Sequence, residues 1–313
     1  MKTKAVRMYG KDDLRLETFE LPQIKDDEIL VKVMSDSICM STYKLVQQGK
    51  AHKRCPQNVD TNPVIGHEFA GVIAQVGDKW KDQFKVGDKF AQQPALNYKG
   101  RLDSPGYSYE WCGGATEYCI MPHEVMELGC LLPYEGKSFY KASLGEPMSC
   151  IIGGYHSNYH TNKRDHSHQM GTKVDGNILV LGGCGPMGLG TIEYGLHFEN
   201  KPKRIVVTEI DDARIERAKQ VISPESAAEL GIELVYVNTA KCDDPVKTLM
   251  DITEGHGYDD EFVMAPVKPL VELGDQILAF DGCMNFFAGP TDKNFQSLIN
   301  MYNIHYTSSH IMG

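Results

Sequence analysis

Long apolar runs are absent from this sequence. The 313 residues contain no stretch of about 18 consecutive apolar residues, which argues against a membrane-spanning helix. The N-terminal residues, MKTKAVRMYGKDDLRLE, carry charges too early for the apolar core of a secretory signal peptide. The sequence therefore predicts a cytoplasmic protein with no membrane partner.

Positive charge and paired cysteines are also scarce. Lys and Arg number 32 against 42 Asp and Glu, which gives a formal net charge of -10. Nucleic acids select basic surfaces, so this balance argues against a nucleic-acid partner. The 9 cysteines are odd in number and scattered, without the closely spaced pairs of a disulfide framework. A reducing compartment is favoured for this reason.

The character of the sequence changes near residue 145. Before it, short runs such as 28–35 and 69–76 end in turn signals, a pattern typical of a β-rich unit or small barrel. After it, apolar runs such as 178–181 alternate with segments of helical length, which indicates βαβ units and a parallel sheet. We expect a surface loop over 161–175. The predicted fold is α/β, with a β-rich domain over residues 1–150 and a parallel-sheet domain over 151–313.

A glycine-rich turn follows the strand expected at 178–181 and opens a helix. Its residues, GCGPMG, fit the pattern G-x-G-x-x-G, in which the glycines allow a tight turn and close approach of a pyrophosphate. The N-terminus of the following helix then faces the phosphates. About 20 residues later, Glu209 ends the next expected strand, where an acidic residue accepts a hydrogen bond from a ribose 2′-hydroxyl. The candidate cofactor-binding residues are Gly183, Gly185, Pro186, Met187, Gly188 and Glu209.

This pattern predicts a Rossmann domain that binds NAD. A carboxylate at Glu209 would repel the 2′-phosphate of NADP, so NAD is favoured while NADP stays possible. The alternative is that the glycines form only a structural turn and that Glu209 is an exposed strand end.

Potential metal ligands gather in the first half of the chain. Cys39, His67 and Glu146 offer a thiol, an imidazole and a carboxylate, which are the ligand types of zinc. A catalytic zinc keeps one position open for water or substrate, so three protein ligands suffice. Taken singly, each residue has an ordinary structural explanation, such as a cysteine acting as a small buried apolar residue. The spacing alone leaves both interpretations open.

Several ordered motifs together resemble the zinc-containing medium-chain dehydrogenases, the group of alcohol and sorbitol dehydrogenases. The motifs are SICMST (37–42), PVIGHEFAGVIAQVG (63–77), KVGDKF (85–90), GGATEYCIMP (113–122), LGEPMSC (144–150) and GGCGPMG (182–188). The resemblance implies a GroES-like catalytic domain joined to a Rossmann domain. It also implies a homo-oligomer, and a further C-terminal portion that returns to the catalytic domain and is missing from this sequence.

The same resemblance implies roles for individual residues. Cys39, His67 and Glu146 would bind zinc, and Glu68 would be an exchanging or outer ligand. Ser41 occupies the position of the hydroxyl that relays the proton, although a turn hydroxyl bonded to the backbone is the alternative. The implied catalytic residues are therefore Ser41, Cys39, His67 and Glu68. A second, structural zinc is not expected, because residues 92–114 contain a single cysteine.

Further segments resemble the L-sorbose 1-phosphate reductases, which interconvert that sugar phosphate and D-glucitol 6-phosphate. They are SDSICMSTYK (35–44), AHKR (51–54), PGYSYEW (105–111), EPMSCIIGGYHSNYHT (146–161) and NFFAGPTDKNF (285–295). This implies reversible ketone-to-alcohol chemistry on a phosphorylated sugar. The alternatives are an unphosphorylated polyol such as sorbitol, threonine as the substrate, or a non-catalytic dinucleotide-binding protein. A phosphate needs cations, and the candidates are Lys44, His52, Lys53, Arg54 and Lys293. Each of them is equally well explained as a solvated surface charge, and Tyr107 and Tyr109 either line a sugar pocket or pack.

Overall fold

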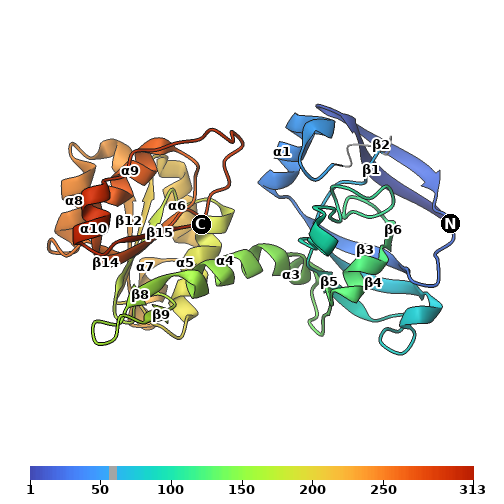
Figure 1. Cartoon of the computed structure of the whole chain (residues 1–313), viewed down its shortest axis with the longest axis horizontal. Coiled ribbons are helices and arrows are strands. Elements are labelled where there is room, and N and C mark those ends of the chain that lie inside the picture. Colours follow the sequence, from blue (N-terminus) through green and yellow to red (C-terminus); the bar gives the residue numbers. More distant parts are fainter. Residues whose placement is uncertain (56–61) are drawn as a thin grey trace. The chain divides into compact units, whose positions relative to one another are not determined.

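The computed structural model describes residues 1–55 and 62–313, which divide into two compact units, Met1–Met148 and Ser149–Gly313. Each unit has its own sheets and its own apolar core (Figure 1). Within the described ranges, no helix combines the length and the apolar character needed to cross a membrane.

Unit 1 is built around antiparallel strands. β1 (Lys2–Gly10) pairs with β2 (Asp13–Glu20), and five other strands form a sheet in the order β6-β3-β4-β5-β7. These strands are β3 (Ile29–Ser37), β4 (Glu68–Val76), β5 (Lys89–Gln92), β6 (Tyr118–Met121) and β7 (Leu131–Pro133). The helical segments are α1 (Met40–Gln48), η1 (Gly49–Ala51), η2 (Asp78–Trp80), η3 (Tyr98–Gly100), α2 (His123–Glu127) and α3 (Phe139–Ser143).

Side chains on one face of this sheet form the core of unit 1. Val31, Phe69 and Phe90 come from three neighbouring strands and are almost fully buried. Within β4, a Cβ at Gly71 would lie 2.0 Å from the carbonyl oxygen of Lys32 on β3, so this position accepts only glycine. The strands expected at 28–35 and 69–76 are confirmed as β3 and β4, and they place the ends of both strands beside the candidate zinc ligands.

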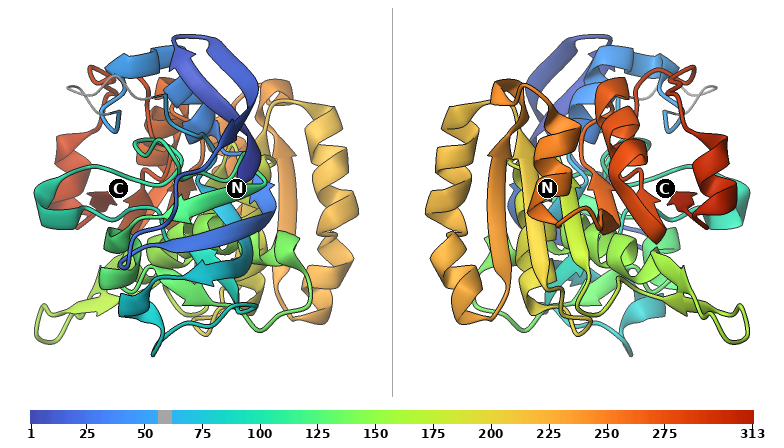
Figure 2. Two further views of the ribbon diagram at one scale, coloured as in Figure 1. Left: turned by 90° about the vertical axis from the view of Figure 1, so that its right-hand side faces the viewer. Right: turned by 90° about the vertical axis from the view of Figure 1, so that its left-hand side faces the viewer.

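Unit 2 is a parallel sheet covered by helices (Figure 2). Its strand order is β12-β11-β10-β13-β14-β15, from β10 (Asn177–Leu181), β11 (Arg204–Glu209), β12 (Glu233–Asn238), β13 (Tyr258–Val263), β14 (Leu278–Asn285) and β15 (His310–Met312). The helical segments after α4 (Gly145–Ser157) are α5 (Pro186–His197), α6 (Asp212–Val221), α7 (Pro224–Glu229), η4 (Thr239–Lys241), α8 (Pro245–Ile252), α9 (Lys268–Ile277) and α10 (Met301–Tyr306). Every residue of β10, β11 and β13 is buried, as in a sheet covered on both faces.

The expected α/β fold with a β-rich part and a doubly wound parallel sheet is confirmed. The expectation of a loop over 161–175 is wrong in part, because β8 (Tyr159–Thr161) and β9 (His168–Met170) form an antiparallel hairpin there. All three residues of β9 are exposed, so this strand lacks the apolar alternation by which a strand is recognised in a sequence.

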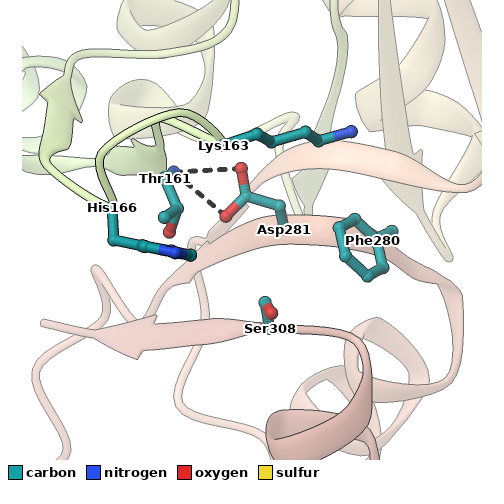
Figure 3. A pocket seen from close by; sticks show the side chains of 6 residues that line it. All are labelled: Thr161, Lys163, His166, Phe280, Asp281 and Ser308. Atoms are coloured by element: carbon teal, nitrogen blue, oxygen red, sulfur yellow. Dashed lines mark hydrogen bonds between the residues drawn. The ribbon is translucent and has the colours of Figure 1, made fainter.

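A pocket of unit 2 lies between this hairpin and strands β14 and β15 (Figure 3). It is lined by Thr161, Lys163, His166, Phe280, Asp281 and Ser308. Both carboxylate oxygens of Asp281 accept from the backbone N–H of Thr161 at 3.0 Å, and His310 Nε2 lies 3.0 Å from Oδ1. This carboxylate holds the hairpin onto the sheet. Asp281 also lies in the first half of β14, whereas parallel sheets bind ligands at the carboxyl ends of their strands.

Candidate active site

Cys39 lies at the junction between β3 and α1. It is the N-cap of α1, and its Sγ accepts a hydrogen bond from the backbone N–H of Ser41 at 3.4 Å. Burial raises the pKa of the Cys39 thiol to about 11, which the N–H of Ser41 opposes and the carboxylate of Glu68 reinforces. A thiol in such a position ionises when it binds a metal cation.

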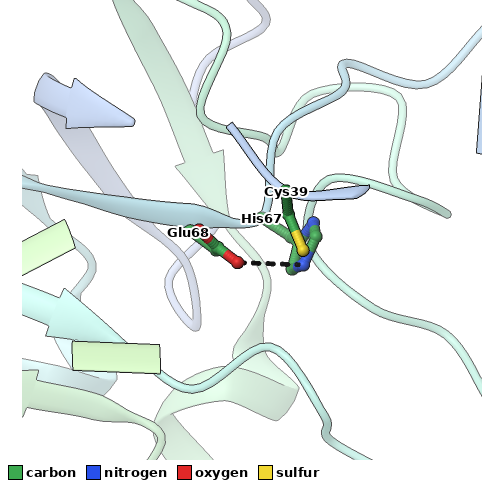
Figure 4. Close-up of side chains that lie close together, drawn as sticks. All are labelled: Cys39, His67 and Glu68. Carbon is green, nitrogen blue, oxygen red and sulfur yellow. Dashed lines mark ion pairs between the residues drawn. The ribbon is translucent and has the colours of Figure 1, made fainter. Parts of the chain in front are cut away.

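His67 and Glu68 lie opposite this thiol, where the chain enters β4. One ligand atom from each of Cys39, His67 and Glu68 lies within 4.8 Å of the other two (Figure 4). The His67 and Glu68 side chains are almost fully buried, and His67 Nε2 lies 3.9 Å from Glu68 Oε1. Burial and, to a smaller extent, the charge of Arg54 together lower the pKa of His67 to about 4. The imidazole is therefore neutral at pH 7, which is the form that binds a metal.

Two hydroxyl groups contact the two nitrogens of the His67 ring. Thr42 Oγ1 lies 3.2 Å from Nδ1, and Tyr107 Oη lies 3.3 Å from Nε2. A metal-binding histidine usually donates its second N–H to an oxygen, which fixes the ring and its tautomer. Thr42 fits that role, with Nε2 left for the metal. The sequence analysis missed Thr42, although it lies three residues after Cys39 in the first turn of α1.

Two more carboxyl groups, those of Glu146 and Asp36, lie close to Glu68. Burial and then the neighbouring Glu68 raise the pKa of Glu146 to about 7. Asp36 at the end of β3 also has a pKa raised to about 7, by burial and then by Glu68. Ser37 Oγ donates to Glu68 Oε2. Glu146 is not one of the three residues grouped above, but its carboxyl group lies beside that of Glu68.

This donor set fits a divalent cation. It offers sulfur, nitrogen and oxygen ligands of the types that zinc accepts. Asp36 supports the fit, because its Oδ1 is buried and has no hydrogen-bond partner within the described part of the chain. Buried carboxyl groups with raised pKa values near a thiol and an imidazole are the environment that a cation stabilises.

Two of the predicted cations, Arg54 and His52, lie against the Tyr107 ring at this cluster. The guanidinium of Arg54 lies 5.7 Å from the centre of that ring, and its charge helps to lower the pKa of His67 and opposes the rise in the pKa of Glu146. Its Nη1 donates to the carbonyl oxygen of Leu102 at 3.1 Å. Lys53 is exposed, and Lys293 is exposed in unit 2.

Ser41 also lies at the cluster, on the first turn of α1. Burial raises the pKa of the Tyr107 phenol, the thiol of Cys39 raises it further, and a hydrogen bond with the Ser41 side chain lowers it. The hydroxyl groups of Ser41 and Tyr107 are therefore neighbours beside Cys39 and His67.

The three glycines of the turn in unit 2 have different surroundings. A Cβ at Gly188 would lie 2.1 Å from the carbonyl oxygen of Gly183, and one at Gly183 would lie 2.6 Å from Val180 Cγ1. A Cβ at Gly185 would meet nothing within 4 Å. The first and third glycines are thus required for packing, whereas the second leaves open space at the start of α5, with Pro186 in its first turn and Met187 next.

This open space is where a dinucleotide fits. β10 lies between β11 and β13, so the turn after β10 is at the point where the strand order reverses. Glu209 ends β11; its Oε1 accepts from the N–H of Ile210 at 2.9 Å, and its Oε2 lies 3.9 Å from Arg214. Burial and then the charge of Glu209 raise the pKa of Cys184 in the turn to about 12. The carboxylate is therefore close to the glycine turn.

Comparison with known proteins identifies the family. Residues 25–129 match the alcohol dehydrogenase GroES-like domain. The chain is 50% identical over 313 residues to mannitol-1-phosphate 5-dehydrogenase of Aliivibrio fischeri, covering 100% of this chain and 74% of that protein. The chain belongs to the zinc-containing medium-chain dehydrogenases.

A second relative supports the assignment, and a solved structure shares the fold. The chain is 44% identical over 312 residues to L-sorbose 1-phosphate reductase of Klebsiella pneumoniae, covering 99% of this chain and 75% of that protein. The crystal structure of 2R,3R-butanediol dehydrogenase from Bacillus subtilis matches with a TM-score of 0.77 at 23% identity, covering 99% of this chain and 83% of that chain. The predicted family is thus confirmed, and the chain is an oxidoreductase of the medium-chain dehydrogenase family.

Proposed function

We propose that this chain interconverts the ketone and alcohol forms of a phosphorylated sugar, with zinc and NAD(H) as cofactors. The observation that carries the proposal is the group of Cys39, His67 and Glu68, whose ligand atoms lie within 4.8 Å of one another, with Arg54 close by. In this proposal residues 1–150 form the catalytic domain and residues 151–313 form the NAD-binding domain. A homo-oligomer and a cytoplasmic location stay predictions.

Four side chains would hold the zinc. They are Cys39, His67, Glu68 and Glu146, with Glu68 as the exchanging or outer ligand. Zinc bound there supplies Lewis-acid chemistry, because it polarises the oxygen of a carbonyl or alcohol group. Thr42 orients the His67 ring. Ser41 relays a proton: its hydroxyl oxygen accepts the proton of the substrate hydroxyl on oxidation while its own proton passes toward solvent, and both transfers reverse on reduction.

The cofactor would lie at the glycine turn of unit 2. Gly183, Gly185, Pro186, Met187 and Gly188 would surround the pyrophosphate, and Glu209 would accept from a ribose hydroxyl. NAD bound there supplies or accepts the hydride. Because Glu209 is a carboxylate close to the turn, it disfavours the extra phosphate of NADP.

A phosphorylated substrate is favoured by Arg54. A guanidinium binds a phosphate through two parallel N–H groups, and this one lies at the edge of the candidate zinc site. The two relatives named above act on mannitol 1-phosphate and L-sorbose 1-phosphate, as their names state. Their identities of 50% and 44% extend over nearly the whole chain, which supports a substrate of the same chemical class.

The test compares phosphorylated and free polyols. We expect NAD reduction with D-glucitol 6-phosphate or mannitol 1-phosphate, little with free sorbitol, and loss of turnover when a chelator removes the zinc. The variant Arg54→Met should lower kcat/KM for the phosphorylated polyol by about 10- to 100-fold, the worth of a charged hydrogen bond. Lys53→Met is the matched control, because Lys53 is exposed one residue away, and it should leave kcat/KM unchanged.

Three outcomes would contradict the proposal. A preference for free sorbitol over its phosphate would exclude a phosphorylated substrate. NADH binding without turnover of any polyol would indicate a non-catalytic dinucleotide-binding protein. Full activity in the absence of metal would exclude a zinc-dependent mechanism.

A further inference from the structure

Tyr107 is held against the ring of His67 by the backbone. The preceding residue, Gly106, has φ +77, and a Cβ there would lie 2.2 Å from the carbonyl oxygen of Gly66 and 2.9 Å from the Cα of His67. Only glycine accepts both this conformation and this contact. The backbone N–H of Tyr107 donates to the carbonyl oxygen of Ser104 at 3.1 Å, which closes a turn. The position of Tyr107 is therefore set by main-chain contacts.

The ring of Tyr107 is buried between two histidines. Its centre lies 4.7 Å from that of His67 and 5.5 Å from that of His52, against which it stacks at 17°. The whole residue is 5% exposed. Its Oη lies 3.3 Å from His67 Nε2, next to the side chain of Ser41. The one polar atom of this side chain thus faces the zinc ligands and the relay hydroxyl of the proposed function.

The hydrogen of this hydroxyl group requires an acceptor. A buried hydroxyl is rarely left without a partner, and in this structure Nε2 of His67 lies within hydrogen-bond distance of it, at 3.3 Å. Nε2 has a single lone pair, which it gives up when it binds a metal ion. The hydroxyl group of Tyr107 is then free to donate to another oxygen beside the metal, with the side chain of Ser41 next to it.

We propose that Tyr107 Oη donates a hydrogen bond to the reacting oxygen of the substrate. This inference rests on the proposed function, and it adds a catalytic residue to it. Tyr107 keeps its proton throughout, while the hydroxyl proton of the alcohol passes through the hydroxyl group of Ser41 toward solvent and a bound nicotinamide would accept or supply the hydride. A fixed donor stabilises the negative charge that develops on the oxygen during hydride transfer. Tyr107 also favours substrates whose reacting oxygen lies within hydrogen-bond distance of the hydroxyl groups of both Ser41 and Tyr107.

The variant Tyr107→Phe tests the proposal, with Tyr109→Phe as the matched control. Tyr109 is a half-buried tyrosine two residues away, and its Oη is buried without a hydrogen-bond partner among the residues described. Both variants remove one phenolic oxygen from the same turn region. Zinc affinity is measured by competition with a chelator, and kcat and KM are measured on D-glucitol 6-phosphate.

We expect two effects of Tyr107→Phe that Tyr109→Phe lacks. First, zinc binds about 2- to 10-fold more tightly, because the metal no longer has to displace a hydrogen bond to Nε2. Second, kcat falls by about 100-fold, as on removal of one donor to a developing oxyanion, with KM changed less than about threefold. The zinc measurement requires no turnover, so it tests the position of Tyr107 separately from the proposed function.

Three results would overturn this role of Tyr107. One is unchanged zinc affinity in Tyr107→Phe, because the hydroxyl would then not face Nε2. The second is a kcat close to that of the parent enzyme. The third is loss of zinc or an equal loss of kcat in Tyr109→Phe, which would indicate a structural role for this turn. Absence of turnover in the parent protein with zinc bound would instead count against the proposed sugar-phosphate activity.

Discussion

Because of the buried carboxyl group of Glu261, we expect the free energy of unfolding to fall as the pH rises. Glu261 lies within β13, in the interior of the parallel sheet, and it is 0% exposed. Neither carboxyl oxygen has a hydrogen-bond partner in the described part of the chain. A Cβ at Gly274 of α9 would lie 2.4 Å from Oε2, so the side chain packs directly against that helix. Burial raises the pKa of Glu261 well above its ordinary value of 4.5, and the charges of Asp275 and Asp260 raise it further.

The direction of this pH dependence follows from the proton that the Glu261 carboxyl group keeps in the folded state. The unfolded chain loses this proton as the pH rises through 4.5, whereas the folded protein keeps it up to its own, higher pKa. Between these two values the folded state binds one more proton, so the free energy of unfolding falls as pH rises. The slope is about 1.4 kcal/mol per pH unit.

The variant Glu261→Gln removes this slope. An amide has nearly the same shape but does not titrate, so at pH 5 we expect the two proteins to differ by no more than about 1–3 kcal/mol, the range for one unsatisfied polar group. As the pH rises, the variant should gain stability relative to the parent by about 1.4 kcal/mol per unit. Other ionisable groups are common to both proteins, and their contributions cancel in the difference.

Urea unfolding followed by circular dichroism between pH 5 and pH 9 measures this difference. Both tryptophans, Trp80 and Trp111, are in unit 1, so their fluorescence reports a transition that Glu261→Gln should leave unchanged. Glu229→Gln, at an exposed position of α7, controls for the loss of one negative charge. Parallel curves of stability against pH for parent and Glu261→Gln would refute the reasoning.

Three further predictions concern the candidate sites. Thr42→Val should weaken zinc binding by about 10- to 100-fold, measured by chelator competition, while Thr42→Ser retains it, since His67 needs an oxygen at Nδ1; equal affinities would exclude this role. Glu209→Ala should weaken NADH binding by about 10-fold and NADPH binding by less, measured by fluorescence titration, because one hydrogen bond to the ribose is lost. Asp36→Asn removes a buried acid beside Glu68, so it should raise the melting temperature of the metal-free protein and reduce the further rise in melting temperature that zinc causes. An increase in both quantities, or a decrease in both, would contradict this.

Local patterns were sufficient to predict several of the strands. β3, β4, β10 and β11 are short apolar runs closed by turn residues, and the structure confirms each of them. β13 is harder to recognise, because YDDEFV places three acidic residues in a fully buried strand. Asp259 and Asp260 find their partners in Lys173, Asn177 and Asn158, which are more than 80 residues away. Such pairing depends on the tertiary fold and leaves no local pattern.

In the candidate site, too, some residues could be selected from the sequence, whereas the role of others depends on the tertiary fold. Resemblance to a family selected Cys39, His67 and Glu68, and the structure brings their ligand atoms together. Tyr107 could be singled out only as an aromatic residue in a loop. Its contact with Nε2 depends on the close approach of Gly106 to Gly66, which are 40 residues apart in the sequence. Neither residue type nor spacing indicates that contact.

Four buried carboxyl groups of the described residues differ in their surroundings. Asp259 and Asp260 accept hydrogen bonds from side chains and backbone of their own unit, and these hydrogen bonds stabilise the fold. Glu261 has no donor within the described residues, so its carboxyl group destabilises the fold as the pH rises. Asp36 also has an oxygen without a donor, but it lies beside Glu68 and close to the thiol and imidazole of the candidate site. An unsatisfied acid therefore indicates a cation site only where neutral ligand atoms accompany it, and this criterion selects unit 1 and rejects β13.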